Sequence, residues 1–154
     1  MTTKRLIEAA VIAAVYAVLT MVLAPISYGM MQVRISEALT VLPFFTPAAV
    51  PGLFVGCLVA NLLSPYGLPD LVFGSLASLL AAAGSYLLRR RPVLVPLPPV
   101  IANGVLVGAM LYYVYEVPVS LPFSMLWVAA GEMLSCYGLG YPLMRCLKKY
   151  KGIF

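Results

Sequence analysis

Long apolar runs are the feature of this sequence that most restricts its fold. They cover about residues 6–24, 70–88 and 96–115. A helix rising about 1.5 Å per residue needs roughly 20 such residues to cross a bilayer core about 30 Å thick. Of the 154 residues, 63% are hydrophobic and 10% are charged, whereas soluble domains carry about 25% charged residues. We therefore predict an all-α integral membrane protein, with residues 1–154 forming a single transmembrane domain.

The basic residues indicate how the chain is oriented. All except Arg34 fall in three clusters, namely Lys4 and Arg5, then Arg89 to Arg91, then Arg145, Lys148, Lys149 and Lys151. Cytoplasmic loops of membrane proteins carry an excess of lysine and arginine. We therefore place both termini and the central cluster in the cytoplasm. No basic patch is interleaved with aromatic residues, so the net charge of +5 does not indicate nucleic-acid binding.

Residues 37–64 are difficult to assign because Pro43, Pro47, Pro51 and Gly52 interrupt them. They form either one long broken helix or two short helices that turn near residues 46–51. The positions of the basic clusters favour two helices. With only one helix here, the number of membrane crossings would place the central arginine cluster on the outer side.

Together with segments at about 6–24, 70–88, 96–115 and 122–147, this predicts six transmembrane helices. Pro25 and Gly29 are expected to end the first helix. The loop 25–36, which includes Gln32, and the loop 64–70 are expected on the outer side.

The residues that enzyme chemistry requires are mostly absent. The sequence has no histidine, no cluster with metal-ligand spacing, no nucleophile elbow and no phosphate-binding glycine loop. Cys57, Cys136 and Cys146 show no CxxC spacing and are interpreted as small packing residues. We predict a protein that is not an enzyme and has no metal or cofactor; active transport would need a partner or an ion gradient.

Small residues recur at intervals of four in the first segment. Ala9, Ala13 and Ala17 share one helix face, with Ala10 and Ala14 beside them. Such a surface allows another helix to approach closely. It serves either for packing within the bundle or for docking a partner protein.

Two polar residues lie deep in apolar segments. Glu132 and Asn103 fall near the middle of their predicted helices, beside Gly131 and Gly104. An ionisable group at that depth is by default a functional-site hypothesis. The alternative is that Glu132 is a buried ion pair or a protonated acid bonded to a neighbouring helix.

Further polar residues gather toward the outer side. Glu37 and Asp70 begin helices, where a carboxylate also stabilises the helix end. Arg34 either contributes to a site or extends to the head groups. Tyr28 and Tyr137 either stack on a flat ring or pack in the bundle. Asn61 is a further polar residue of this group. The stretch 33–45, which holds Arg34 and Glu37, is expected to line the outer rim of a helical cup.

Five segments cover most of the chain, namely APISYG (24–29), VRISEALTVLPFFTPAAVPGLFVGCLVANLLSP (33–65), DLVFGSLASLLAA (70–82), PLPPVIANGVLVG (96–108) and GEMLSCYGLGYPL (131–143). Taken together, they resemble one known family, the QueT family of queuosine-precursor transporters. The resemblance implies the substrate-binding S component of an energy-coupling factor (ECF) transporter, in a prokaryotic cell membrane. It also implies a transmembrane coupling protein (EcfT) and two ATPases (EcfA and EcfA'), with Ala9, Ala13 and Ala17 docking the coupling protein.

The same resemblance implies a 7-deazaguanine ligand such as preQ1, preQ0 or queuine. Glu37 and Glu132 would supply two carboxylates for its donors, and Asn103 and Asn61 would supply amide contacts. Which glutamate contacts which edge stays open. The alternatives are an S component for a different small vitamin, a membrane enzyme that uses Glu132 as acid or base, and a structural assembly subunit.

Overall fold

A computed structural model describes residues 2–28 and 33–150, and these form helices and connecting turns without any strand. Gly29, Gln32 and Lys151, which the sequence analysis mentions, lie outside these ranges. The elements in order are α1 (Thr3–Val22), α2 (Ala24–Ser27), the 3-10 helix η1 (Ile35–Phe44), α3 (Ala49–Asn61), α4 (Gly67–Pro69), the π-helix η2 (Asp70–Gly74), α5 (Ser75–Leu87), η3 (Leu88–Arg90), η4 (Pro92–Leu94), α6 (Leu97–Tyr113), α7 (Leu121–Met133), the π-helix η5 (Leu134–Gly140) and α8 (Tyr141–Lys149).

Helical structure occupies every segment that the sequence predicts. Three stretches are long and apolar enough to cross a membrane, namely Thr3–Val22, Gly67–Arg90 and Pro92–Tyr113. Between 37 and 64 the chain forms two short apolar helices, η1 and α3, which turn at residues 45–48. The prediction of two short helices is therefore confirmed.

Two predicted boundaries differ from the structure. The first helix ends at Val22, and Pro25 lies in the first turn of α2, where proline is tolerated because its missing N–H has no helical partner. The fourth segment begins at Gly67 instead of Asp70, so the preceding connection is residues 62–66.

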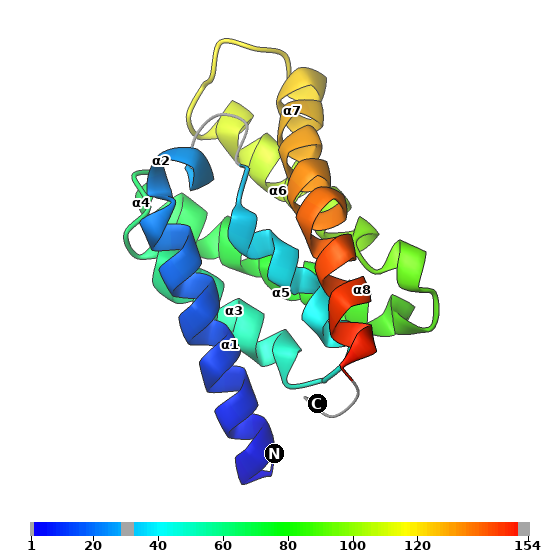
Figure 1. Ribbon diagram of the computed structural model, residues 1–154. Helices are drawn as coiled ribbons and strands as arrows, with labels where there is room; N and C mark the ends of the chain where they lie inside the picture. Colours follow the sequence, from blue (N-terminus) through cyan, green and yellow to red (C-terminus); the bar gives the residue numbers. More distant parts are fainter. Residues whose placement is uncertain (1, 29–32, 151–154) are drawn as a thin grey trace.

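The helices pack in sequence around η1 (Figure 1). α1 packs on α3, α3 on α5, α5 on α6 and α6 on α7, while η1 contacts η5, α5 and α1. The start of α1 and the end of α8 lie at one end of the molecule, and α2, α4 and the α6–α7 connection lie toward the other. Because η1 is enclosed, the stretch expected along an open outer rim lies in the bundle interior instead.

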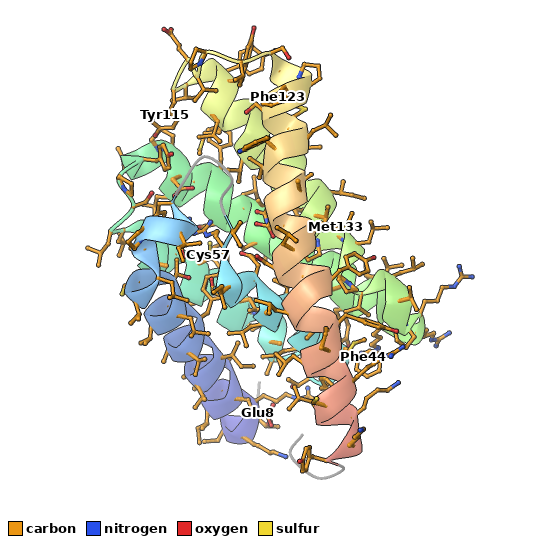
Figure 2. The ribbon with its side chains drawn as sticks, turned by 45° about the horizontal axis from the view of Figure 1, so that its top comes forward. Glu8, Phe44, Cys57, Tyr115, Phe123 and Met133 are labelled. Carbon is orange, nitrogen blue, oxygen red and sulfur yellow. The ribbon has the colours of Figure 1, made fainter. Side chains whose placement is uncertain are left out.

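The outer surface is strongly apolar, whereas the interior holds polar groups. Phe123 and Met133 on α7 are 46% and 49% exposed, while Cys57 on α3 is fully buried (Figure 2). An apolar exterior of this kind suits a lipid environment. Arg34, Glu37 and Glu132 are each at most 1% exposed.

The small-residue face of α1 packs inside the bundle. Ala9, Ala13 and Ala17 are buried, and a Cβ added at Gly52 or Gly56 of α3 would lie 2.8 Å from the carbonyl oxygen of Ala9 or Ala13. These contacts support the alternative that this face packs within the bundle, because the glycines bring α3 against it. Docking of a coupling protein on Ala9, Ala13 and Ala17 stays a prediction.

Candidate functional site

The carboxylate of Glu37 is the centre of a buried polar cluster. Tyr16 of α1 donates its hydroxyl proton to Glu37 Oε1, and Ser78 of α5 donates to the same oxygen at 3.5 Å. Glu37 Oε2 has no hydrogen-bond partner in the described chain. The carboxylate is therefore held at one oxygen and free at the other.

A second carboxylate and a thiol lie beside it. One carboxylate oxygen each of Glu37 and Glu132 and the Sγ of Cys136 all lie within 4.8 Å of one another. The Cys136 thiol donates to Glu132 Oε2 at 3.5 Å and lies 3.7 Å from the Thr40 hydroxyl. Two carboxylates this close in an apolar interior need a proton, a cation or a hydrogen-bond donor to compensate them.

Asn103 of α6 supplies an amide next to this pair. It is 1% exposed, and neither Oδ1 nor Nδ2 has a hydrogen bond of ordinary geometry within the described residues. Its side chain nevertheless interacts with Glu132 as a hydrogen-bond partner. Because a buried amide with incomplete hydrogen bonding is costly, Asn103 offers both a donor and an acceptor to a guest.

Arg34, Asn61 and Asp70 form a neighbouring cluster. Arg34 Nη2 donates to Asn61 Oδ1 at 2.5 Å, and Asn61 Nδ2 donates to the Asp70 carbonyl oxygen at 2.9 Å. Both carboxylate oxygens of Asp70 are buried without a partner in the described structure. Arg34 is buried, which corrects the alternative that it extends to the head groups.

The two tyrosines expected near the ligand lie at different places. The Tyr28 ring lies 5.7 Å from the Arg34 guanidinium carbon, and its hydroxyl donates to the Ala60 carbonyl oxygen at 2.7 Å. The Tyr137 hydroxyl donates to the Val93 carbonyl oxygen beside η4 at 3.0 Å. Tyr137 therefore uses its hydroxyl in packing, and the structure does not bring it to the carboxylate pair.

Three non-α segments carry site residues. Glu37 lies in the ten-residue 3-10 helix η1, Asp70 in the π-helix η2 and Cys136 in the π-helix η5. Runs of 3-10 helix beyond about four residues are uncommon, and π-helices occur frequently at functional sites. The irregular backbone thus coincides with the polar cluster.

Comparison with known proteins agrees with the resemblance seen in the sequence. The family model described as QueT transporter matches residues 6–149. The chain belongs to the QueT transporter family. It is 37% identical over 79 residues to the queuosine precursor transporter QueT of Lactococcus lactis subsp. cremoris (strain MG1363), an alignment that covers 50% of this chain and 46% of that relative. No solved structure matches the chain significantly.

Sequence reasoning missed several residues of the candidate site in this member of the QueT family. Tyr16, Ser78 and Thr40 were not singled out, and Cys136 was interpreted as a packing residue. A tyrosine within the first apolar run, on the same side as Ala9 and Ala13, was the available signal for Tyr16. The grouping of Cys136 with Glu37 had no signal in sequence spacing, because the two residues come from separate helices.

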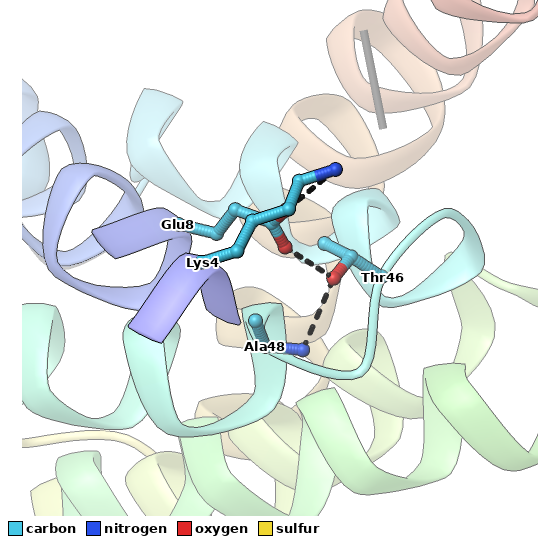
Figure 3. A network of polar contacts seen from close by, with 4 residues as sticks. All are labelled: Lys4, Glu8, Thr46 and Ala48. Atoms are coloured by element: carbon cyan, nitrogen blue, oxygen red, sulfur yellow. Dashed lines mark hydrogen bonds and ion pairs between the residues drawn. The ribbon is translucent and has the colours of Figure 1, made fainter. Parts of the chain in front are cut away.

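Sequence reasoning also missed a polar contact at the end of the helical bundle where α1 begins. Thr46 donates to Glu8 Oε2 at 2.9 Å and accepts from the Ala48 amide at 3.2 Å, while Lys4 Nζ lies 3.7 Å from Glu8 Oε1 (Figure 3). These contacts join the start of α1 to the turn between η1 and α3.

Proposed function

We propose that this protein is the substrate-binding S component of an ECF transporter and that it binds a queuosine precursor of the 7-deazaguanine class. The observation that carries the proposal is the buried group formed by Glu37, Glu132 and Cys136 in a member of the QueT transporter family. The Lactococcus lactis relative is named as a queuosine precursor transporter, which supports this class of ligand.

The chemistry of the cluster suits such a ligand. A guanine-type edge presents adjacent N1–H and N2–H donors, which a carboxylate accepts in pairs. The amide of Asn103, beside Glu132 and without a hydrogen bond of ordinary geometry in the described chain, would supply a donor for the O6 carbonyl. A site whose buried polar groups are paired by the ligand rejects analogues that lack the matching donors, because those groups would then be left unpaired.

The proposed topology is six membrane crossings with both termini in the cytoplasm. The three long apolar helices, the two short ones and the helical stretch 121–149 supply the six crossings. The position of the α1 start and the α8 end at one end of the bundle supports a common side for the termini. The multi-pass protein would lie in a prokaryotic cell membrane.

Import would be driven by the EcfT coupling protein and two ATPases. The sequence itself has no phosphate-binding loop for ATP. We place the partner contact on the exposed side of α1, where Ala10 and Ala14 retain the four-residue spacing. Replacing both by leucine should abolish co-purification with the coupling protein and leave ligand binding intact.

Ligand binding tests the proposal directly. Isothermal titration of the detergent-purified protein with preQ1 should give saturable binding, and mass spectrometry should identify a 7-deazaguanine that co-purifies. Glu132→Gln and Glu37→Gln should weaken binding, whereas Glu116→Gln, in the exposed connection after α6, should not. Unchanged affinity in both site variants would remove the assignment.

A further inference from the structure

We infer that the two glutamates divide the ligand between them. Glu132 accepts the paired N–H donors of the guanine edge, and Glu37 binds a cationic group carried by the ligand. The inference rests on the proposed function and names the substrate within that class, a 7-deazaguanine that carries an alkylammonium group on its five-membered ring.

The hydrogen bonds of Glu37 leave it one point of attachment. Tyr16 and Ser78 both donate to Oε1, and a carboxylate oxygen has about two lone-pair sites. Paired acceptance from N1–H and N2–H would need both oxygens to be free. Only Oε2 lacks a partner in the described chain, and one free oxygen suits a single charged N–H donor.

Glu132 is held by weaker donors and lies beside the amide that a guanine requires. The Cys136 thiol donates to its Oε2 at 3.5 Å, and a thiol is a weak donor that a ligand N–H readily replaces. Asn103 is its other side-chain partner, without a hydrogen bond of ordinary geometry in the described chain. Together they offer an acceptor pair for N1–H and N2–H and a donor for O6.

The balance of buried charge favours a cationic ligand. Glu37, Glu132 and Asp70 are three buried carboxyl groups, and Arg34 is the one buried basic side chain of the described residues. Arg34 donates to Asn61 and forms no ion pair within 4.0 Å in that part of the chain, so its single charge acts on Glu37, Glu132 and Asp70 only from a longer distance. A ligand ammonium beside Glu37 would add a second positive charge in direct contact with a carboxylate, whereas a neutral nitrile would not.

Tyr16 acts as a positioning residue in this scheme. Its fully buried hydroxyl holds Glu37 Oε1, which determines which oxygen faces the ligand. Removing the hydroxyl would free the carboxylate to rotate and would weaken the discrimination between charged and neutral substituents. It would not remove the contacts of the guanine edge.

The experiment compares two ligands of nearly equal size. PreQ1 carries an aminomethyl cation, and preQ0 carries a neutral nitrile at the same ring position. Dissociation constants are measured by isothermal titration for the full chain and for Glu37→Gln, Glu132→Gln and Tyr16→Phe, with a chelator present throughout. Glu116→Gln and Ser124→Ala serve as controls, because Ser124 is buried and donates only to the Gly108 carbonyl in the described chain.

We expect the unaltered protein to bind preQ1 roughly tenfold to hundredfold more tightly than preQ0, the range of a charge-assisted hydrogen bond. Glu37→Gln should remove this preference and leave preQ0 affinity within about threefold. Glu132→Gln should weaken both ligands by a similar factor and keep the preference. Tyr16→Phe should reduce the preference several-fold while preQ0 still binds.

The outcomes separate the two proposals. Binding of neither ligand to the unaltered protein would refute the proposed function itself. Equal affinity for preQ1 and preQ0 would overturn the inference and leave the proposed function standing. Loss of the preference in Glu132→Gln with its retention in Glu37→Gln would show that the roles are reversed. Thermal unfolding of each variant in detergent distinguishes a lost contact from a lost fold.

Discussion

Arg34 Nη2 donates a 2.5 Å hydrogen bond to Asn61 Oδ1, which joins the start of η1 to the end of α3 inside the bundle. Asn61 extends the connection to η2 through the Asp70 carbonyl oxygen. One amide side chain therefore accepts from one nitrogen of a buried guanidinium, whose Nε has no partner in the described chain, and donates to a backbone carbonyl group of another element. A charged group buried in this way depends strongly on its partner.

Replacing Asn61 should destabilise the protein. In Asn61→Ala the Arg34 guanidinium loses the hydrogen bond to Asn61 Oδ1 and keeps its contact with Tyr28, and we expect a cost of about 3 kcal/mol. Thermal unfolding in detergent should show a markedly lower midpoint. The control is Ser124→Ala, which removes a neutral buried hydrogen bond and should cost about 1 kcal/mol. Equal losses in the two variants would contradict this role of Asn61.

Gly56 should not tolerate even a methyl group. A Cβ there would lie 2.8 Å from the Ala13 carbonyl oxygen and 2.9 Å from the Tyr16 Cβ. Gly56→Ala should therefore separate α1 from α3, at a cost of about 1–3 kcal/mol, and displace Tyr16 from Glu37. Gly138→Ala is the matched control, since a Cβ at that helical glycine meets nothing within 4 Å. A midpoint of unfolding that falls equally in both variants would argue against the packing of α1 on α3.

Tyr66, in the connection between α3 and α4, should make stability fall at alkaline pH. Burial raises the pKa of its phenol above the ordinary value of 10.0, and the charge of Asp70 adds to the increase. The folded state then keeps this proton at a pH where the unfolded state loses it. The contribution is fully present below about pH 10 and declines as the pH rises above it. Unfolding midpoints measured between pH 8 and 11 should fall less steeply for Tyr66→Phe than for the unaltered protein.

The three cysteines should differ in their rates of alkylation. Cys146 on α8 is exposed, whereas Cys57 and Cys136 are buried. Mass spectrometry after brief maleimide treatment of the folded protein should find label on Cys146 first. Denaturation should make all three react. Rapid labelling of Cys136 in the folded protein would show that the carboxylate cluster is open to water.

Composition and local pattern were enough to predict the helical segments. Apolar runs of the right length indicated three long helices. In lipid an unpaired backbone N–H or C=O group is costly, and an α-helix pairs these groups within a single segment. The prolines between residues 43 and 51, combined with the basic clusters, indicated two short helices where one broken helix was the alternative. Both arguments depend on neighbours in sequence, and the structure bears them out.

Only the tertiary structure decided which faces and which polar groups meet. The rotation of α1 about its axis follows from Gly52 and Gly56 on another helix, and it buries Ala9 and Ala13 while it directs Tyr16 toward Glu37. Glu37, Glu132 and Cys136 come together because η1 packs against η5. Such contacts join residues far apart in the chain. Their energy depends on how side chains from separate helices pack against one another, and this packing cannot be predicted from composition or from spacing along the sequence.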